Sequence, residues 1–141
     1  MVRMGRDPET GGHIACVAEA GPGEGGFAVT RLTVAADIGR IVNLDIARQQ
    51  IEGGLVYGLA MALGTSIRLN RGRPVPRTLG ELQLPTLRNS PAIVLDFLAS
   101  DAPPFDPGEL GVAVAPPAIA NAVFSATGRR YRSLPLIEDA A

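Results

Sequence analysis

The sequence predicts an α+β fold in which antiparallel strands pack with one long and one short helix. Two β-prone runs, residues 14–19 and 27–36, are joined by a glycine-rich loop, as in a hairpin. A long segment with helical spacing follows from about residue 44, and a shorter one begins near residue 117. Prolines and glycines separate these segments, so turns connect the strands and helices.

The chain has 141 residues, of which 46% are hydrophobic. This size suits a single unit over residues 1–141, with a loose lead-in over residues 1–12 and a tail over residues 137–141. The net charge is -1 and no long basic block is present, so we expect neither nucleic acid nor an anionic membrane as a partner. No apolar run approaches the roughly 20 residues of a membrane span.

Cys16 is the only cysteine and His13 the only histidine, which excludes an internal disulfide and a zinc cluster of these residue types. A Ser-His-Asp triad would need His13 as its base, and its position among glycines favours an ordinary loop residue. Because no charged-then-apolar leader opens the sequence, we expect a cytoplasmic location, with export to the periplasm alongside a partner as the alternative.

The long helix has a clear start signal. Asn43 suits the N-cap, because its side-chain oxygen can accept a hydrogen bond from a free backbone N–H. Asp45 places a negative charge near the positive end of the helix dipole, so the helix should begin near Leu44. Before it, Asp37 and Arg40 could form an ion pair across a turn, a structural role that we favour over catalysis.

This helix has one bulky face and one nearly bare face. The apolar stripe consists of Ile51, Leu55, Leu59 and Leu63, and the bare line of Gln50, Gly54 and Gly58. Each interior glycine costs a helix about 1 kcal/mol relative to alanine, so Gly53, Gly54 and Gly58 indicate the close approach of another group. That group is either a crossing helix or a polar ligand, and Gln50 slightly favours the ligand.

The following part of the chain is rich in turns. We expect a short strand over residues 67–69 and a turn over residues 71–74, and prolines exclude a long helix from residues 74–90. Residues 93–99 alternate as a strand does, with side chains pointing to opposite faces.

A short helix is expected from about Pro117 to Thr127. Pro116 and Pro117 suit a first helical turn, where a missing N–H does no harm, and Gly128 suits the position after the helix end.

Glu109 is the strongest candidate for acid–base chemistry. It lies in a proline- and glycine-constrained loop, residues 101–111, just before the predicted helix and among apolar residues. Burial would favour its neutral form and the helix dipole its charged form, so the sequence leaves its protonation state open. A solvated surface glutamate is the alternative.

Four stretches form an ordered set of motifs. The chain reads Asp-Ile-Gly-Arg-Ile-Val-Asn-Leu-Asp-Ile over residues 37–46, Gln-Ile-Glu-Gly-Gly-Leu-Val-Tyr-Gly-Leu over residues 50–59 and Gly-Glu-Leu-Gly over residues 108–111, and residues 118–136 complete the set. Together they resemble the C-terminal portion of the molybdopterin-binding large subunit of the xanthine dehydrogenase and aldehyde oxidoreductase family, the molybdenum hydroxylases. The resemblance implies that the α+β unit is part of a molybdenum-cofactor-binding domain.

The resemblance also implies a molybdopterin cofactor, often the cytosine dinucleotide form in bacteria, whose dithiolene holds molybdenum without a protein metal ligand. Glu109 matches the family's general base, which takes the proton from a Mo-bound hydroxyl as that oxygen attacks an electrophilic carbon and hydride passes to a sulfido ligand. Gln50 matches a glutamine close to the pterin. Gly53 and Gly54 would let the helix approach the cofactor, and Gly108 would shape the loop that holds Glu109.

The family's molybdenum subunit is several times longer than this chain. The resemblance therefore implies a split subunit or fragment, inactive alone, whose site a larger molybdopterin-binding chain completes. Partner subunits would carry 2Fe-2S clusters and FAD, and the substrate would be a small aldehyde or N-heterocycle. Leu110, Ala113 and Val114 depart from the family pattern near Glu109, and residues 77–84 match it poorly. The alternatives are a non-catalytic structural or assembly module that stabilises a partner subunit, and an independent small-ligand binder.

Overall fold

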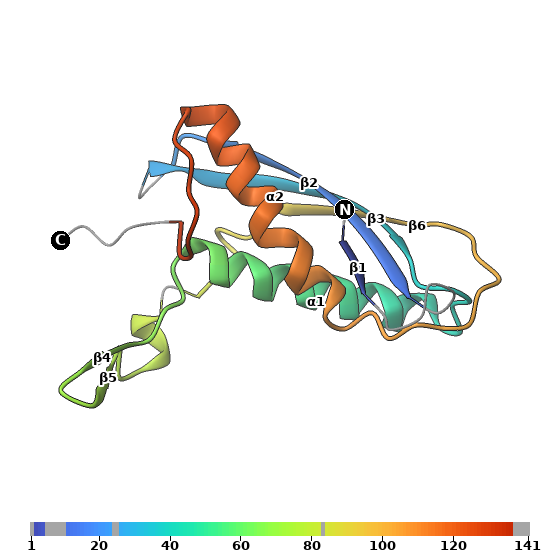
Figure 1. The fold of residues 1–141 in the computed structure, drawn as a ribbon, viewed down its shortest axis with the longest axis horizontal. Helices are drawn as coiled ribbons and strands as arrows, with labels where there is room; N and C mark the ends of the chain where they lie inside the picture. The colour runs from blue at the N-terminus through green and yellow to red at the C-terminus, as the bar shows by residue number, and fades with distance from the viewer. Residues whose placement is uncertain (1, 5–10, 24–25, 83, 137–141) are drawn as a thin grey trace.

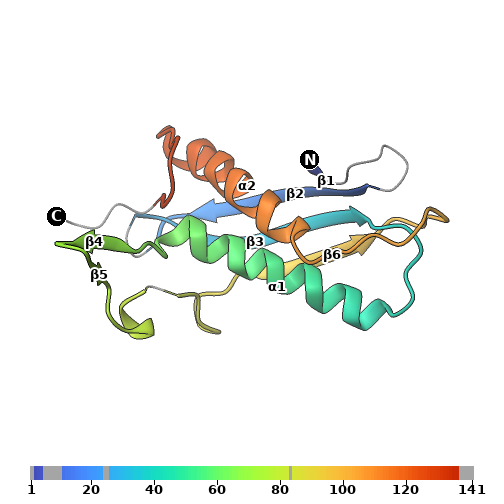
Figure 2. The ribbon, with the colours of Figure 1, turned by 60° about the horizontal axis from the view of Figure 1, so that its bottom comes forward.

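Two helices cover one face of a four-stranded sheet in the computed structural model, which describes residues 2–4, 11–23, 26–82 and 84–136 (Figures 1 and 2). The predicted α+β class is confirmed. In chain order the elements are β1 (Val2–Met4), β2 (Gly12–Gly21), β3 (Ala28–Asp37), α1 (Leu44–Leu63), β4 (Arg68–Asn70), β5 (Arg73–Val75), the 3-10 helix η2 (Leu79–Glu81), β6 (Ala92–Phe97) and α2 (Leu110–Thr127).

The sheet has the strand order β1-β2-β3-β6. The predicted hairpin is confirmed, because β2 and β3 are antiparallel, with Cys16 opposite Val34. In contrast, β6 pairs with β3 in parallel, with Leu32 beside Ile93. A parallel pair needs a crossover connection, and α1 supplies most of it.

The expected loose lead-in is wrong for two of its parts. Val2–Met4 forms β1, which pairs antiparallel with β2, and Gly12 is the first residue of β2. Residues 5–10 of the lead-in, and the predicted tail over residues 137–141, lie outside the described residues. The sequence of β1 has no strong alternation of apolar and polar residues, and pairing with the edge of β2 stabilises this short strand.

One apolar core joins the sheet to both helices. Its fully buried side chains come from β2, β3, α1, α2 and the segment after α2, and the largest include Ile14, Leu32, Ile51, Leu55, Leu59, Leu110, Ile119 and Leu136. Three of the four predicted stripe residues of α1 are completely buried, and Leu63 is partly buried against the same core. The hydrophobic effect therefore fixes which face of α1 points towards the sheet.

The start of α1 agrees with the prediction. Asn43 is the N-cap, and its Oδ1 accepts a hydrogen bond of 3.0 Å from the backbone N–H of Ile46. Asp45 lies in the first turn. The predicted ion pair between Asp37 and Arg40 does not form; instead, Asp37 Oδ1 accepts a hydrogen bond from Gly39 N at 3.0 Å.

The prediction for α2 is wrong about its start and its length. The helix begins at Leu110, so Pro116 and Pro117 lie inside it rather than in its first turn. An interior proline removes one helical hydrogen bond and disfavours the helix by about 3 kcal/mol. Buried residues on both sides of the prolines, Leu110, Val114, Ile119 and Val123, hold this helix against the core. Its predicted end is confirmed, with Gly128 at φ 73° as the C-cap.

Helix α2 is long and apolar enough to cross a membrane by length and composition alone, with a mean hydropathy of 1.4 over Leu110–Thr127. It packs along β2 and against α1. Its buried residues, 39% of the helix, pack in this core.

The loop before α2 follows the exit of β3. Backbone hydrogen bonds join Leu98 N to Ala36 O at 2.8 Å, Arg40 N to Ala102 O at 2.9 Å, and Phe105 N to Ile38 O at 2.9 Å. These bonds hold the loop so that residues 106–109 lie beside α1.

Candidate functional site

All four predicted cofactor residues line one pocket. Gln50, Gly53 and Gly54 come from α1 and Gly108 from the loop before α2, and the pocket has a volume of about 520 Å³. They are 58 positions apart at most along the chain, counting from Gln50 to Gly108. The fold therefore brings together residues that the sequence resemblance had grouped by motif alone.

Gln50 and Gly53 form the open side of this pocket. The Gln50 side chain is exposed, and its amide has no hydrogen-bond partner among the described residues. A methyl group added at Gly53 would meet no atom within 4 Å. An amide offers both donors and an acceptor, so a polar molecule can bind Gln50 while resting on the bare backbone at Gly53.

Gly54 and Gly58 instead face α2. A Cβ at Gly54 would lie 3.3 Å from the Cα of Gly111, and a Cβ at Gly58 would lie 3.0 Å from the Ala115 side chain. For these two glycines, the crossing-helix explanation is correct. Of the three glycines in α1, Gly53 alone borders open space.

Gly108 is held by its own loop. Asp106 Oδ1 accepts a hydrogen bond of 3.0 Å from Gly108 N, a turn in which a side chain replaces a backbone acceptor. A Cβ at Gly108 would lie 3.8 Å from Gln50 Oε1. This closeness places the loop beside the polar end of Gln50.

Glu109 occupies the N-cap position of α2, and its side chain makes no capping hydrogen bond. It directly follows Gly108 but does not itself line the pocket. The expectation that apolar residues surround it is wrong for this chain, because Glu109 is exposed whereas its neighbour Leu110 is buried.

The sequence prediction missed three residues of the pocket, Gln49, Tyr57 and Val112. Tyr57 could have been found, because it lies four positions after Gly53 and therefore on the same helical face. Val112 could not, because it belongs to a turn of α2 that lies before the predicted start of the helix near Pro117. All seven lining residues are uncharged at neutral pH, so the pocket suits a neutral polar surface more than a free ion.

The described residues contain no group of three or more His, Cys, Asp or Glu side chains that could hold a metal ion. Any metal bound at this pocket would thus have to be held by something other than a cluster of such side chains from these residues.

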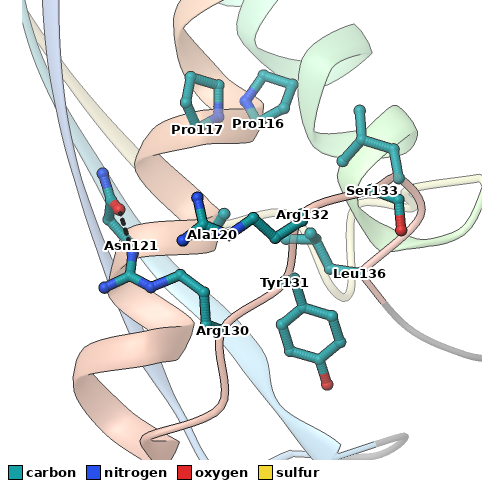
Figure 3. Close-up of a pocket in the computed structure, with 10 residues that line it drawn as sticks. Pro116, Pro117, Ala120, Asn121, Arg130, Tyr131, Arg132, Ser133 and Leu136 are labelled. Atoms are coloured by element: carbon teal, nitrogen blue, oxygen red, sulfur yellow. Dashed lines mark hydrogen bonds between the residues drawn. The ribbon is translucent and has the colours of Figure 1, made fainter.

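A second pocket, of about 450 Å³, lies between the C-terminal half of α2 and residues 130–136 (Figure 3). Arg130 crosses it, donating a hydrogen bond to Asn121 Oδ1 at 3.4 Å and placing its guanidinium carbon 3.6 Å from the centre of the Phe124 ring. Leu136 N bonds to Ala62 O at 2.8 Å and ties this segment to the end of α1. None of the predicted site residues lies in it.

Comparison with known proteins identifies a family whose model matches this chain. The family model for the molybdopterin cofactor-binding domain matches residues 6–91. This range contains α1 with Gln50, Gly53 and Gly54, and it ends before Gly108 and Glu109.

Two curated relatives extend beyond that range. The chain is 36% identical over 123 residues to a membrane-bound aldehyde dehydrogenase (pyrroloquinoline-quinone) of Gluconacetobacter polyoxogenes, covering 86% of this chain and 16% of the relative. It is 30% identical over 131 residues to isoquinoline 1-oxidoreductase subunit beta of Brevundimonas diminuta, covering 92% of this chain and 17% of the relative.

Among solved structures, the aldehyde oxidoreductase from Desulfovibrio desulfuricans ATCC 27774 superposes with a TM-score of 0.70 at 29% identity. The match covers 79% of this chain and 13% of that one. The chain thus spans less than a fifth of the length of each of these three proteins.

Proposed function

Because the chain belongs to the molybdopterin cofactor-binding domain family of the molybdenum hydroxylases, we propose that it is a split subunit or fragment of such an enzyme. The enzyme oxidises an aldehyde or an N-heterocycle, and this chain contributes a general base and part of the pterin site. The observation that carries the proposal is the meeting of Gln50, Gly53, Gly54 and Gly108 in one pocket beside Glu109.

The residues present fit a pterin. Its ring edge carries amide and amino groups, and the Gln50 amide can donate to and accept from such an edge. Gly53 leaves the backbone of α1 bare where a flat ring would rest. The molybdopterin group, possessing its own dithiolene, needs no metal-binding side chain from this chain, and when bound it supplies the oxygen transfer and takes up the electrons.

The residues of this chain have simpler tasks in that reaction. Gln50 orients the pterin, Gly53 permits its close approach to α1, and the Asp106 turn fixes Gly108 and hence the backbone of Glu109. Glu109 accepts a proton during substrate oxidation. A base must be held within hydrogen-bond reach of the proton that it removes, and attachment to the first residue of a core helix provides such a fixed position.

A larger molybdopterin-binding chain completes the site in this proposal. Glu109 is exposed here, and the pocket borders open space at Gly53, so in this proposal the remaining walls come from residues outside this sequence. Iron–sulfur and FAD subunits would then remove the electrons. The isoquinoline relative is named as a subunit, which agrees with a multi-subunit enzyme.

Co-expression of this chain with its larger companion chain, followed by metal and cofactor analysis, tests the proposal. Molybdenum, pterin and turnover that appear only when both chains are present support it. Pyrroloquinoline quinone in place of molybdenum would contradict it, and that outcome is worth testing because one relative is named for the quinone.

The second candidate is a structural or assembly module that stabilises a partner subunit without chemistry. The exposure of Glu109 and its lack of a capping bond favour it, since neither feature requires a catalytic role. A companion chain that is fully active without this chain would support the module and exclude the enzyme.

A further inference from the structure

The segment from residue 66 to residue 90, here called the basic arm, projects away from the sheet and the two long helices (Figures 1 and 2). Its strands β4 and β5 form a separate two-stranded sheet. None of its described residues is buried. A two-stranded hairpin alone is marginally stable in water, so contacts within this chain explain the order of the arm poorly.

The arm displays large aliphatic side chains. Leu69 is 72% exposed and Leu79 is 74% exposed, and Ile67, Val75, Leu84 and Leu87 are exposed as well. Leu69 lies directly opposite Pro74 across the hairpin, whereas Asn70 lies opposite Arg73. Opposed residues share a face, so one face of the hairpin is apolar, and the other carries Asn70 and Arg73 together with the pair of Arg68 and Val75.

The charge of the arm is opposite to that of the rest of the chain. It holds five arginines and one acidic residue, a net charge of +4, whereas the remaining residues hold eight arginines and 13 acidic residues, a net charge of -5. The one acid, Glu81, is occupied with Arg77 N and the Thr78 hydroxyl, each at 3.0 Å. Arg71, Arg73 and Arg88 have no ion-pair partner among the described residues.

We propose that the basic arm is the docking element through which this chain binds the larger chain of the enzyme, on a surface that combines carboxylates with an apolar patch. This inference rests on the proposed function. The family model extends to residue 91 and so includes the arm within the domain, while the chain spans 16% of its aldehyde dehydrogenase relative. The missing remainder of such a protein is the polypeptide available to cover this surface.

The composition of the arm favours a protein partner over a nucleic acid or a lipid surface. Residues 66–90 contain no aromatic residue, so the arm lacks the aromatic side chains on which bases commonly stack and which commonly anchor a segment in a membrane interface. Arginine binds carboxylates in a bidentate manner, and aliphatic side chains need an apolar protein surface to exclude water.

Titration of the full chain against the purified larger chain tests this inference. Replacing Arg71→Glu and Arg73→Glu together should weaken binding by about tenfold at low salt and by less at high salt, because screening weakens exposed charge pairs. Replacing Ile67→Ser and Leu69→Ser together should weaken it by about tenfold at both salt concentrations. The charge-conserving pair Arg71→Lys and Arg73→Lys should bind much more tightly than the glutamate pair.

All substituted positions are exposed, and an unchanged melting temperature of each variant will exclude misfolding as a cause. Arm variants that bind as tightly as the wild-type chain, in a complex that still carries molybdenum, would overturn this inference and leave the proposed function intact. A wild-type chain that never binds the larger chain would overturn both. Arm-dependent sedimentation with phosphatidylserine vesicles, without any effect on the protein complex, would assign the arm to a lipid surface instead.

Discussion

Gly54 of α1 and Gly111 of α2 face each other where the two helices cross. A Cβ at Gly111 would lie 2.6 Å from Ile51 O, and a Cβ at Gly54 would lie 3.3 Å from the Cα of Gly111. Both atoms met are backbone atoms, which cannot rotate away. The crossing therefore depends on the absence of both side chains.

The first prediction is that Gly111→Ala separates the two helices and destabilises the chain by about 3 kcal/mol, the upper part of the range for overpacking a core. Urea unfolding monitored by circular dichroism measures this change. The matched control is Gly53→Ala, the same substitution in open space on α1, which should stabilise the helix by about 1 kcal/mol. Equal unfolding midpoints for the two variants would show that the crossing is looser than the structure indicates.

The second prediction concerns Gln50. Its amide makes no hydrogen bond among the described residues, so Gln50→Ala should leave the free energy of unfolding almost unchanged. If the amide binds the pterin, the assembled complex should lose about tenfold in cofactor affinity, the value of one or two good hydrogen bonds. Molybdenum content and the fluorescence of released pterin measure this loss independently of activity.

Gln50→Glu is the informative companion variant, because it keeps the shape and an acceptor but removes the amide donors. Cofactor loss in the alanine variant alone would assign an acceptor role to Gln50. Full cofactor content in both variants would remove Gln50 from the pterin site.

Local signals predicted α1 well. Asn43 and Asp45 act on the helix end through one hydrogen bond and one dipole interaction, both within four residues, so the sequence was sufficient. The start of α2 was missed because Pro116 and Pro117 look like a first turn, whereas burial of Leu110 and Val114 extends the helix in front of them. Tertiary packing outweighed a local preference there.

Long-range features were less accessible. Alternating side chains over residues 93–99 predict a strand but contain no signal for its direction, so the parallel pairing of β6 with β3 was not predicted. For the site, the resemblance grouped Gln50 with Gly108, but spacing could not decide what approaches each glycine. In the fold, α2 covers Gly54 and Gly58, whereas the pocket opens at Gly53.

The third prediction concerns Cys16, which is partly buried against the core. Burial raises the pKa of its thiol from 9.0 to about 11. The thiolate is the reactive form, so iodoacetamide should modify the folded chain at pH 8 about 100-fold more slowly than the unfolded chain. Mass spectrometry over time measures both rates, and equal rates would contradict a protected thiol.

The raised pKa of Cys16 also makes the free energy of unfolding depend on pH. The folded chain holds the proton more tightly than the unfolded chain, so this contribution is fully present below pH 9 and is lost as the pH rises towards 11. The comparison of the wild-type chain with Cys16→Ala isolates the contribution of the thiol, because the two chains share every other ionisable group. The free energy of unfolding should fall more steeply between pH 9 and pH 11 in the wild-type chain.

The last prediction separates chemistry from structure at Glu109. Its side chain is exposed and makes no capping bond, so Glu109→Gln should leave the melting temperature and the molybdenum content of the assembled complex unchanged. Glutamine cannot accept the proton, and turnover should fall by at least about 100-fold, the contribution of a positioned base. Asp101→Asn, which removes another exposed carboxylate from the same loop, should turn over normally. Asp106→Ala should instead lower stability by about 1 kcal/mol, because it removes the acceptor of Gly108 N. Normal turnover in Glu109→Gln would exclude this residue as the base and favour the assembly module, since an exposed glutamate without a partner would then have no remaining task in the reaction.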